Sequence, residues 1–431
     1  MKHKLSQLKQ HPSYDKAMHW GKLISITGGA QVIVQAVGFL SGVLIIRLLP
    51  TQEYALYTLA NTMLGTMSVL SDGGISTGVM AQGGKVWQDR ERLGAVLATG
   101  LDLRRKFAIG SLIASAPILI YLLLHNDASW LTAIMIVLSL IPAFFAALSD
   151  SLLEIVPKLH QSILPLQKNM VSVGVGRLVL TALTVFIFPF TFIAILGSGL
   201  PRLYGNIKLK KIANNFIDYN QKPDPLVRKE ILKVVKRVLP GAIYYSLSGQ
   251  ITIWLISIVG NSTSVAQLGA IGRLAMLLSL ISVVFSTLII PRFARLKNDS
   301  ALLMNRFLST LGFLVLVCVF VIAFFMAFST QALWVLGNNY SKLETELVLY
   351  IIGSCIGLLT GFIFSLSSSR GWILNPYLYI VASIISIVIG IFAFNVSTLV
   401  GILLFNIFIN SIQTTLYLFY TLIKIRKNKA L

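Results

Sequence analysis

The stretch from Arg306 to Phe328 reads RFLSTLGFLVLVCVFVIAFFMAF, and it contains no charged side chain after its first residue. About 20 mostly apolar residues are enough for an α-helix to cross the hydrocarbon core of a bilayer. Of the 431 residues in the chain, 56% are hydrophobic and 12% are charged, whereas soluble domains are about 25% charged. This composition excludes a soluble enzyme, a disordered chain and a fibrous protein, and it indicates a polytopic membrane protein.

Apolar stretches of similar length recur along the whole chain. Twelve of them can be marked, at residues 23–48, 55–80, 106–124, 130–149, 169–188, 190–207, 238–260, 264–290, 306–328, 345–368, 372–394 and 397–423. Only Pro189 and its neighbours separate the fifth stretch from the sixth. We therefore predict an all-α polytopic membrane protein with twelve transmembrane helices.

The distribution of basic residues gives an independent test of this topology. The chain has 36 Lys and Arg against 15 Asp and Glu. If both termini are cytoplasmic, 32 of the 36 basic residues lie on the cytoplasmic side, as the positive-inside rule requires. We expect a multi-pass protein of the cell inner (cytoplasmic) membrane with both termini in the cytoplasm. Residues 1–22 are polar and basic and do not resemble a cleavable signal peptide.

The longest inner connection lies near the middle of the chain and separates six predicted spans from six. We expect five parts: a basic cytoplasmic tail, an N-terminal six-helix bundle, a cytoplasmic amphipathic linker, a C-terminal six-helix bundle and a second basic tail, at residues 1–22, 23–207, 208–237, 238–423 and 424–431. Because each bundle crosses the membrane six times, the two bundles must be parallel repeats. Within the linker, LVRKEILKVVKRV (226–238) has apolar residues at helical spacing. It is either a basic helix lying on the inner leaflet or a solvated connector.

A few ionisable residues fall inside the predicted spans, where Arg or Asp costs about 2.5–3.5 kcal/mol. They are Asp72, Arg177 and Arg273, while Arg47 lies near the end of the first span. Asp72 cannot neutralise both Arg177 and Arg273, so at least one of these arginines lacks an acidic partner. An anionic ligand is the simplest partner, since guanidinium matches phosphate in charge and geometry. Backbone carbonyls or water are the alternatives.

Uncharged polar residues form stripes on the same helices. Asn61, Gly65, Ser68 and Asp72 share one helical face. Such stripes indicate a hydrated central cavity, although hydrogen bonds between packed helices would use the same residue types. The candidate substrate-binding residues are Arg177, Arg273, Arg47, Asp72, Asn61, Gln31, Gln250 and Asn410.

Signatures of catalysis and of metal binding are missing from the sequence. It contains no glycine-rich phosphate loop, no CxxC and no HExxH motif. Cys318 and Cys355 sit in apolar runs, which suits buried thiols better than a disulfide or a metal site. We therefore expect no enzyme activity, no catalytic residues, no metal and no cofactor.

Two segments resemble a known family. The chain reads RLLPTQEYALY from Arg47 to Tyr57 and LSDGGISTG from Leu70 to Gly78. They resemble the polysaccharide-biosynthesis branch, which includes O-antigen flippases, of the multidrug/oligosaccharidyl-lipid/polysaccharide (MOP) exporter superfamily. The residues that match the branch's pattern after the first span are Arg47, Leu48, Pro50, Glu53, Tyr54 and Tyr57. Leu49 and Ala55 replace two glycines of that pattern.

The resemblance implies two six-helix bundles around a central cavity, as in MATE transporters. It also implies a flippase that moves an isoprenoid-pyrophosphate-linked oligosaccharide by alternating access during surface polysaccharide synthesis. Its partners would be that lipid-linked oligosaccharide, membrane lipids, a polysaccharide polymerase and glycosyltransferases, with no nucleic acid. The placing of Arg177 and Arg273 in the cavity rests on topology and not on a motif. The alternatives are a multidrug cation antiporter of the same fold and a polytopic polysaccharide polymerase or ligase.

Overall fold

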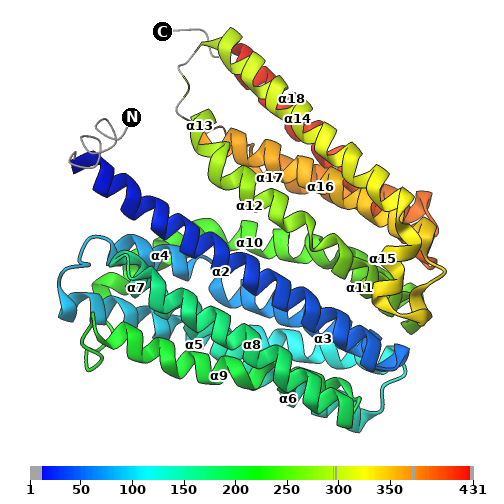
Figure 1. Cartoon of the computed structure of the whole chain (residues 1–431), viewed down its shortest axis with the longest axis horizontal. Coiled ribbons are helices and arrows are strands. Elements are labelled where there is room, and N and C mark those ends of the chain that lie inside the picture. The colour runs from blue at the N-terminus through cyan, green and yellow to red at the C-terminus, as the bar shows by residue number, and fades with distance from the viewer. Residues whose placement is uncertain (1–11, 295, 297–298, 371, 373, 428–431) are drawn as a thin grey trace, which may run out of the picture. The chain divides into compact units, whose positions relative to one another are not determined.

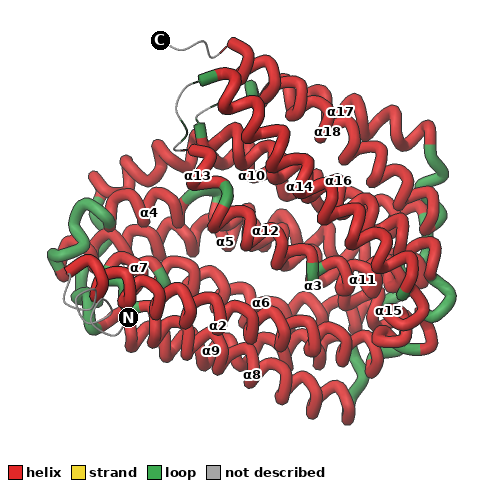
Figure 2. The backbone as a smooth tube through the Cα atoms, turned by 45° about the horizontal axis from the view of Figure 1, so that its top comes forward, coloured by secondary structure: helices red, strands yellow, loops and turns green. Residues whose placement is uncertain are grey.

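The computed structural model describes residues 12–294, 296, 299–370, 372 and 374–427. The regular elements in these residues are helices, with no strand among them (Figure 2). Figure 1 labels most of them along the chain. Their bounds are α2 Pro12–Leu48, α3 Thr51–Asp72, α4 Ile75–Gly83, α5 Arg90–His125, α6 Trp130–Leu153, α7 Ile155–Leu159, α8 Ile163–Ile187, α9 Thr191–Asn214, α10 Pro225–Val259, α11 Ser262–Ala275, α12 Leu278–Leu288, α13 Ile290–Ala294, α14 Ser300–Ala327, α15 Ser329–Leu336, the 3-10 helix η1 Asn338–Tyr340, α16 Glu344–Ser369, α17 Pro376–Ala393 and α18 Leu399–Lys427.

Eight helical segments of the described chain are long and apolar enough to cross a membrane. They coincide with the first, third, fourth, fifth, seventh, ninth, tenth and twelfth predicted spans. An all-helical, multi-pass membrane fold is therefore confirmed. The count of twelve spans stays a prediction.

The other four predicted spans are also helical, but each departs from a simple apolar helix. The second span is divided into α3 and α4, and the eighth into α11 and α12. The sixth corresponds to α9, whose second half is basic, and the eleventh to α17, which has 18 residues. Each of these four segments is therefore too interrupted, too charged or too short to count on its own as an apolar helix that could cross a membrane.

The break in the second span is a sharp corner at two glycines. Gly73 and Gly74 have φ values of 48° and 96°, which strain any residue with a side chain. A Cβ would lie 2.8 Å from the Leu239 Cδ1 at Gly73, and 2.8 Å from the Val238 Cβ at Gly74. Dihedral angle and close packing therefore both require glycine at this corner.

The break in the eighth span directly follows Arg273. The Met276 N–H donates to the Arg273 carbonyl at 3.3 Å, and the Leu277 N–H to the Leu274 carbonyl at 3.3 Å. These are i to i+3 bonds, so the helix tightens into a 3-10 turn before α12 begins. Arg273 thus lies in the last turn of α11, close to the middle of the predicted span.

Helix α10 runs without interruption through the basic segment and the seventh span. It begins at Pro225 as the sequence indicates, and the Asp224 Oδ1 accepts from the Leu226 N–H at 2.7 Å. On its apolar face, Ile231 and Val235 are buried in a protein core that includes Val79. This face therefore packs on other helices. The choice between a helix on the inner leaflet and a solvated connector stays a prediction.

The described chain divides into two compact units. The first unit comprises the chain up to Leu49, Ala60–Leu124 and Ala128–Leu247, and the second comprises Pro50–Leu59, His125–Asp127 and Ser248 onward. In the first unit α6 and α8 each pack on α9, and α2 packs on α8 (Figure 1). In the second unit α16 packs on α14 and α18, and α17 packs on α18.

The predicted domain boundaries stay predictions. In the predicted tails, residues 1–11 and 428–431 lie outside the described residues. Residues 12–22 belong to α2 and residues 424–427 to α18.

Candidate functional site

Arg273 of the second unit is surrounded by tyrosines. Its guanidinium lies within hydrogen-bonding reach of the Tyr54 and Tyr57 hydroxyls, on the first turns of α3. Tyr54 is 1% exposed and Tyr57 is 3% exposed, so the two phenols are fixed by packing. Tyr350 of α16 also lies close enough to feel the charge of Arg273. Three phenols from two helices thus converge on one guanidinium.

Small residues on α11 make this close approach possible. A Cβ at Gly272 would lie 2.9 Å from the Tyr350 Oη, and a Cβ at Gly269 would lie 2.7 Å from the Thr58 Cγ2. The backbone of α11 is therefore in direct contact with α3 and with α16.

No carboxylate lies within ion-pairing distance of Arg273 in the part of the chain that the structure describes. Neutral phenols can accept hydrogen bonds from a guanidinium, but they do not cancel its charge. The arrangement therefore holds a partly buried positive charge in a fixed position. Such a group can bind an anion and has no evident use as a nucleophile or as a general base.

Asp72 of the first unit has a different environment. Its Oδ1 accepts from the Arg104 guanidinium, from the Ser76 Oγ at 2.6 Å and from the Ser76 N–H at 3.2 Å. Arg104 also donates to the Ser76 Oγ at 2.8 Å. The Arg104 side chain is 6% exposed and that of Asp72 is 30% exposed. This network ties the glycine corner between α3 and α4 to α5.

Arg104 is not among the predicted site residues, because the third predicted span begins at residue 106. Helix α5 begins at Arg90, where the Asp89 Oδ1 accepts from the Glu91 and Arg92 N–H groups at 3.1 and 3.0 Å. An Asp just before a helical pattern is a recognised start signal. It could have shown that Arg104 belongs to the spanning helix.

Arg177 lies in the middle of α8 in the first unit and is half-buried. Its Nε is buried and has no hydrogen-bond partner among the described residues. The neighbouring hydroxyl of Thr181, one turn further along, is also buried and without a partner there. Among the described residues, Arg177 therefore resembles Arg273 in forming no ion pair with a carboxylate.

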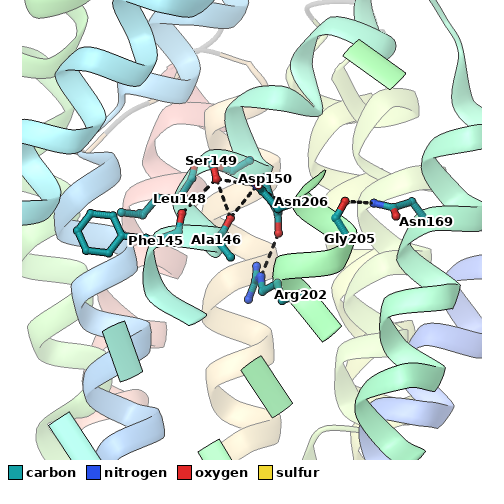
Figure 3. Close-up of polar contacts among 10 residues, drawn as sticks. Phe145, Ala146, Leu148, Ser149, Asp150, Asn169, Arg202, Gly205 and Asn206 are labelled. Carbon is teal, nitrogen blue, oxygen red and sulfur yellow. Dashed lines mark hydrogen bonds and ion pairs between the residues drawn. The ribbon is translucent and has the colours of Figure 1, made fainter. Parts of the chain in front are cut away.

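A second acid in a long helix, Asp150 of α6, also escaped the sequence analysis, which ended the fourth span at residue 149. In Figure 3, Asp150 accepts from the Arg202 Nε at 3.2 Å and from the Asn206 Nδ2 at 2.7 Å. Asn206 also donates to the Ser149 Oγ at 2.6 Å. Asp150 lies in the last turn of α6, which ends at Leu153, and it is committed to partners other than Arg177.

Asn410 of α18 serves to pack helices in the second unit. Its Nδ2 donates to the Gly353 carbonyl at 3.2 Å and to the Asn406 Oδ1 at 2.9 Å, and Asn406 donates to the Thr252 Oγ1 at 3.0 Å. These are the contacts that the packing interpretation predicts for this stripe. Gln250 of α10 is half-buried in the same unit.

The remaining predicted site residues belong to the first unit. Gln31 is half-buried on α2, Arg47 is exposed at the end of α2, and Asn61 is exposed on α3. The eight candidates are thus divided between the units, and their joint role in one site stays a prediction. Among the described residues, no group of three His, Cys, Asp or Glu side chains could hold a metal ion.

Comparison with solved structures gives clear matches across the whole chain. An inward-facing multidrug resistance MATE family transporter of the MOP superfamily matches with a TM-score of 0.75 and 13% identity, over 92% of this chain and 95% of that chain. The lipid II flippase MurJ in an inward closed conformation matches with a TM-score of 0.70 and 13% identity, over 93% and 87%. A MOP superfamily transporter from Pyrococcus furiosus, described as having a binding pocket of reverse polarity, matches with a TM-score of 0.62 and 13% identity, over 95% of each chain.

This chain has the MATE-like fold of these membrane transporters. No family model matches it, and no curated protein matches it significantly. At this identity the likeness establishes the fold and leaves the substrate open. The predicted two-bundle MATE-like class is therefore confirmed as a fold.

Proposed function

We propose that this protein is a flippase that moves an isoprenoid-pyrophosphate-linked oligosaccharide across the cytoplasmic membrane by alternating access, during surface polysaccharide synthesis. The observation that carries the proposal is Arg273, a guanidinium held by tyrosines with no carboxylate among the described residues. A transporter fold that keeps such a cation in a spanning segment is suited to an anionic substrate. The lipid II flippase among the structural matches shows that this fold can serve a lipid substrate.

Charge and geometry both favour a pyrophosphate. A guanidinium presents two parallel N–H groups that match two oxygens of a phosphate, and the hydrogen bonds are charge-assisted. Arg273 in the second unit and Arg177 in the first unit each provide one such group. The phenols of Tyr54 and Tyr57 hold Arg273 in position before the substrate arrives, which reduces the ordering cost of binding.

A multidrug cation antiporter is the second candidate, and the acids argue against it. A cationic substrate or coupling ion calls for a carboxylate that is available. Asp72 is bound to Arg104, and Asp150 is bound to Arg202 and Asn206. The Pyrococcus furiosus structure, whose description links reversed pocket polarity to a different function, supports the view that this fold accommodates substrates of different charge.

The proposal is tested in a strain whose own copy of the gene is deleted and replaced by variants. The amounts of surface polysaccharide and of lipid-linked sugar retained inside are measured together. Arg273→Gln and Arg177→Gln should each lower export at least tenfold and raise the retained lipid-linked sugar. Arg273→Lys should lose less, because the charge stays while the bidentate geometry is lost.

Arg92→Gln is the matched control, since Arg92 is exposed at the start of α5 and pairs only with Asp89 among the described residues. It should export normally. Immunoblots of membrane fractions show whether each variant is inserted in equal amount. Normal export by both Arg273→Gln and Arg177→Gln would exclude the proposed substrate contacts.

The flippase would act between the membrane glycosyltransferases that complete the lipid-linked oligosaccharide and the polymerase that consumes it. Identifying the lipid-linked sugar that accumulates in the deletion strain would name the substrate. If no such sugar accumulates, the proposed function is wrong.

A further inference from the structure

The first unit contains a second basic feature, which does not include Arg177. Arg273 belongs to the other unit. This basic feature is a cavity of about 600 Å³ between α5, α6, α9 and the segment 215–224. Small-molecule sites usually occupy about 300–1,000 Å³. The segment over the cavity is fixed to α5, since the Asp218 N–H donates to the Arg90 carbonyl at 3.1 Å and the Asp224 N–H to the Thr99 Oγ1 at 2.8 Å.

The charged lining of this cavity is mostly basic. It includes Arg104 and Arg105 of α5 and Lys210 of α9, against one acid, Asp102. The Asp102 Oδ2 is already paired with the Lys106 Nζ at 2.8 Å. Arg105 and Lys210 make no ion pair with any residue that the structure describes. The cavity therefore offers positive charge that the protein itself does not neutralise.

Two buried donors at the cavity also lack acceptors. Arg104 is 5% exposed, and its Nε has no hydrogen-bond partner among the described residues, although its other side binds Asp72. The Tyr219 hydroxyl is buried and likewise without a partner there. Burial raises the pKa of Tyr219, so its hydroxyl keeps the proton that it can donate. Because both atoms have almost no accessible surface, they lie behind the lining of the cavity and do not face its interior.

The rest of the cavity is apolar. Its walls include Leu97, Leu101, Phe145, Leu148 and Leu203. Inorganic phosphate has no apolar groups to place against these walls, whereas the glycerol and the first methylenes of a lipid can pack on them. Basic pockets between helices on the cytoplasmic side are known to suit anionic lipid headgroups.

We propose that this cavity binds the phosphate headgroup of an anionic phospholipid, with Arg105 and Lys210 as charge partners. The lining includes Ile217, Tyr219 and Pro223 of the connection between α9 and α10, which the positive-inside rule places at the cytoplasmic leaflet. This inference does not depend on the proposed function, because neither Arg177 nor Arg273 lines the cavity.

Native mass spectrometry of the purified full chain tests the proposal. Phosphatidylglycerol and phosphatidylethanolamine are titrated into the detergent-solubilised protein, and the affinity for the first bound lipid is measured. The wild type should bind phosphatidylglycerol at least tenfold more tightly than phosphatidylethanolamine. The double variant R105Q/K210Q should lose this preference.

The matched control is R92Q/K211Q, which removes two exposed basic residues outside the cavity and changes the net charge equally. It should bind phosphatidylglycerol within twofold of the wild type. If both double variants lost the same affinity for phosphatidylglycerol, the effect would come from general surface charge and the proposed site would be wrong. An unchanged lipid preference in R105Q/K210Q would also overturn the site.

A fluorescent reporter separates lipid from free phosphate without altering the basic residues. In Phe145→Trp, on the cavity wall, phosphatidylglycerol with brominated chains should quench the added tryptophan more than brominated phosphatidylethanolamine does. Inorganic phosphate at equal concentration should not relieve the quenching. Relief by inorganic phosphate, or equal quenching by both lipids, would exclude an anionic phospholipid as the occupant.

Discussion

Arg104 and Arg273 are both arginines in helices of a membrane protein, but they are held in opposite ways. Arg104 meets a carboxylate, Asp72, and a hydroxyl, Ser76, at the glycine corner of the first unit. Arg273 meets the phenols of Tyr54 and Tyr57 in the second unit and no carboxylate among the described residues. The first arrangement cancels the charge of Arg104 and fixes the fold, while the second leaves the charge of Arg273 without a carboxylate among the described residues.

This difference shows that the identity of the partner, and not burial alone, separates a structural arginine from a candidate binding arginine. Removing one member of a buried ion pair strongly destabilises the fold, because the other charge stays buried without compensation. Removing a cation that is held by neutral groups leaves no such uncompensated charge. The two sites should therefore respond differently to mutation.

Asp72→Asn should have the largest effect on stability. It leaves the nearly buried Arg104 without its carboxylate and should lower the free energy of unfolding by about 3–5 kcal/mol. The midpoint of thermal unfolding in detergent measures this loss. Asp102→Asn is the control, since the partly exposed pair of Asp102 with Lys106 contributes at most about 1 kcal/mol. Equal midpoints for the two variants would remove the structural role assigned to Asp72.

Gly74→Ala should disturb the same site through the backbone. The new Cβ would meet the Val238 Cβ at 2.8 Å at a φ of 96°, and overpacking of this kind costs about 1–3 kcal/mol. Gly65→Ala in the preceding helix, α3, has open space around its Cβ and should be neutral or slightly stabilising. Thermal unfolding of both variants tests the corner, which would not be a constraint if Gly74→Ala unfolded like Gly65→Ala.

Arg273→Gln should change the free energy of unfolding by no more than about 1.5 kcal/mol, because lost hydrogen bonds are offset by relief from burying a cation. It should nevertheless lower export at least tenfold, as described above. Unfolding curves recorded beside those of Asp72→Asn give the comparison. A loss as large as that of Asp72→Asn would mean that Arg273 is structural, and the contrast between the sites would fail.

Tyr57→Phe should give the smallest change. Removing one hydroxyl from the group around Arg273 should lower stability by about 0.5–1.5 kcal/mol and leave the second phenol, Tyr54, in place. Tyr204→Phe, at an exposed position on α9, should have no measurable effect. If Tyr57→Phe also unfolds at the wild-type temperature, the Tyr57 hydroxyl does not hold the guanidinium.

Composition and charge distribution were enough to predict an all-helical multi-pass membrane fold. A backbone that crosses a bilayer must have its N–H and C=O groups hydrogen-bonded, and a helix achieves this within one segment. They did not predict the breaks. A hydropathy pattern does not show that Gly73 and Gly74 adopt positive φ, or that the chain tightens after Arg273. These features depend on packing against residues far along the chain, such as Leu239 and Val238.

Of the residues that meet at the candidate site, Arg273 alone was among the predicted site residues, and its contacts were not predicted. Arg273 was identified from its position in an apolar stretch, and Tyr54 and Tyr57 belong to the segment that resembles the polysaccharide-exporter branch. That these residues meet is a tertiary contact across more than half the described chain, which no local pattern contains. Arg104 was not predicted because the third span was placed after the last charged residues of its segment. Charged residues near the end of a helix can nevertheless be buried against neighbouring helices.

The divided segments α3–α4 and α11–α12 also bear on how this protein is made. Each is interrupted near the point where a spanning helix should be most apolar, and neither is among the segments that qualify as a span on its own. The translocon admits segments according to their summed apolarity, so these two would partition weakly into lipid in isolation. Each follows a long helix that does qualify, α2 or α10, and biosynthetic insertion of either weak segment should require that preceding helix to remain beside it at the translocon exit.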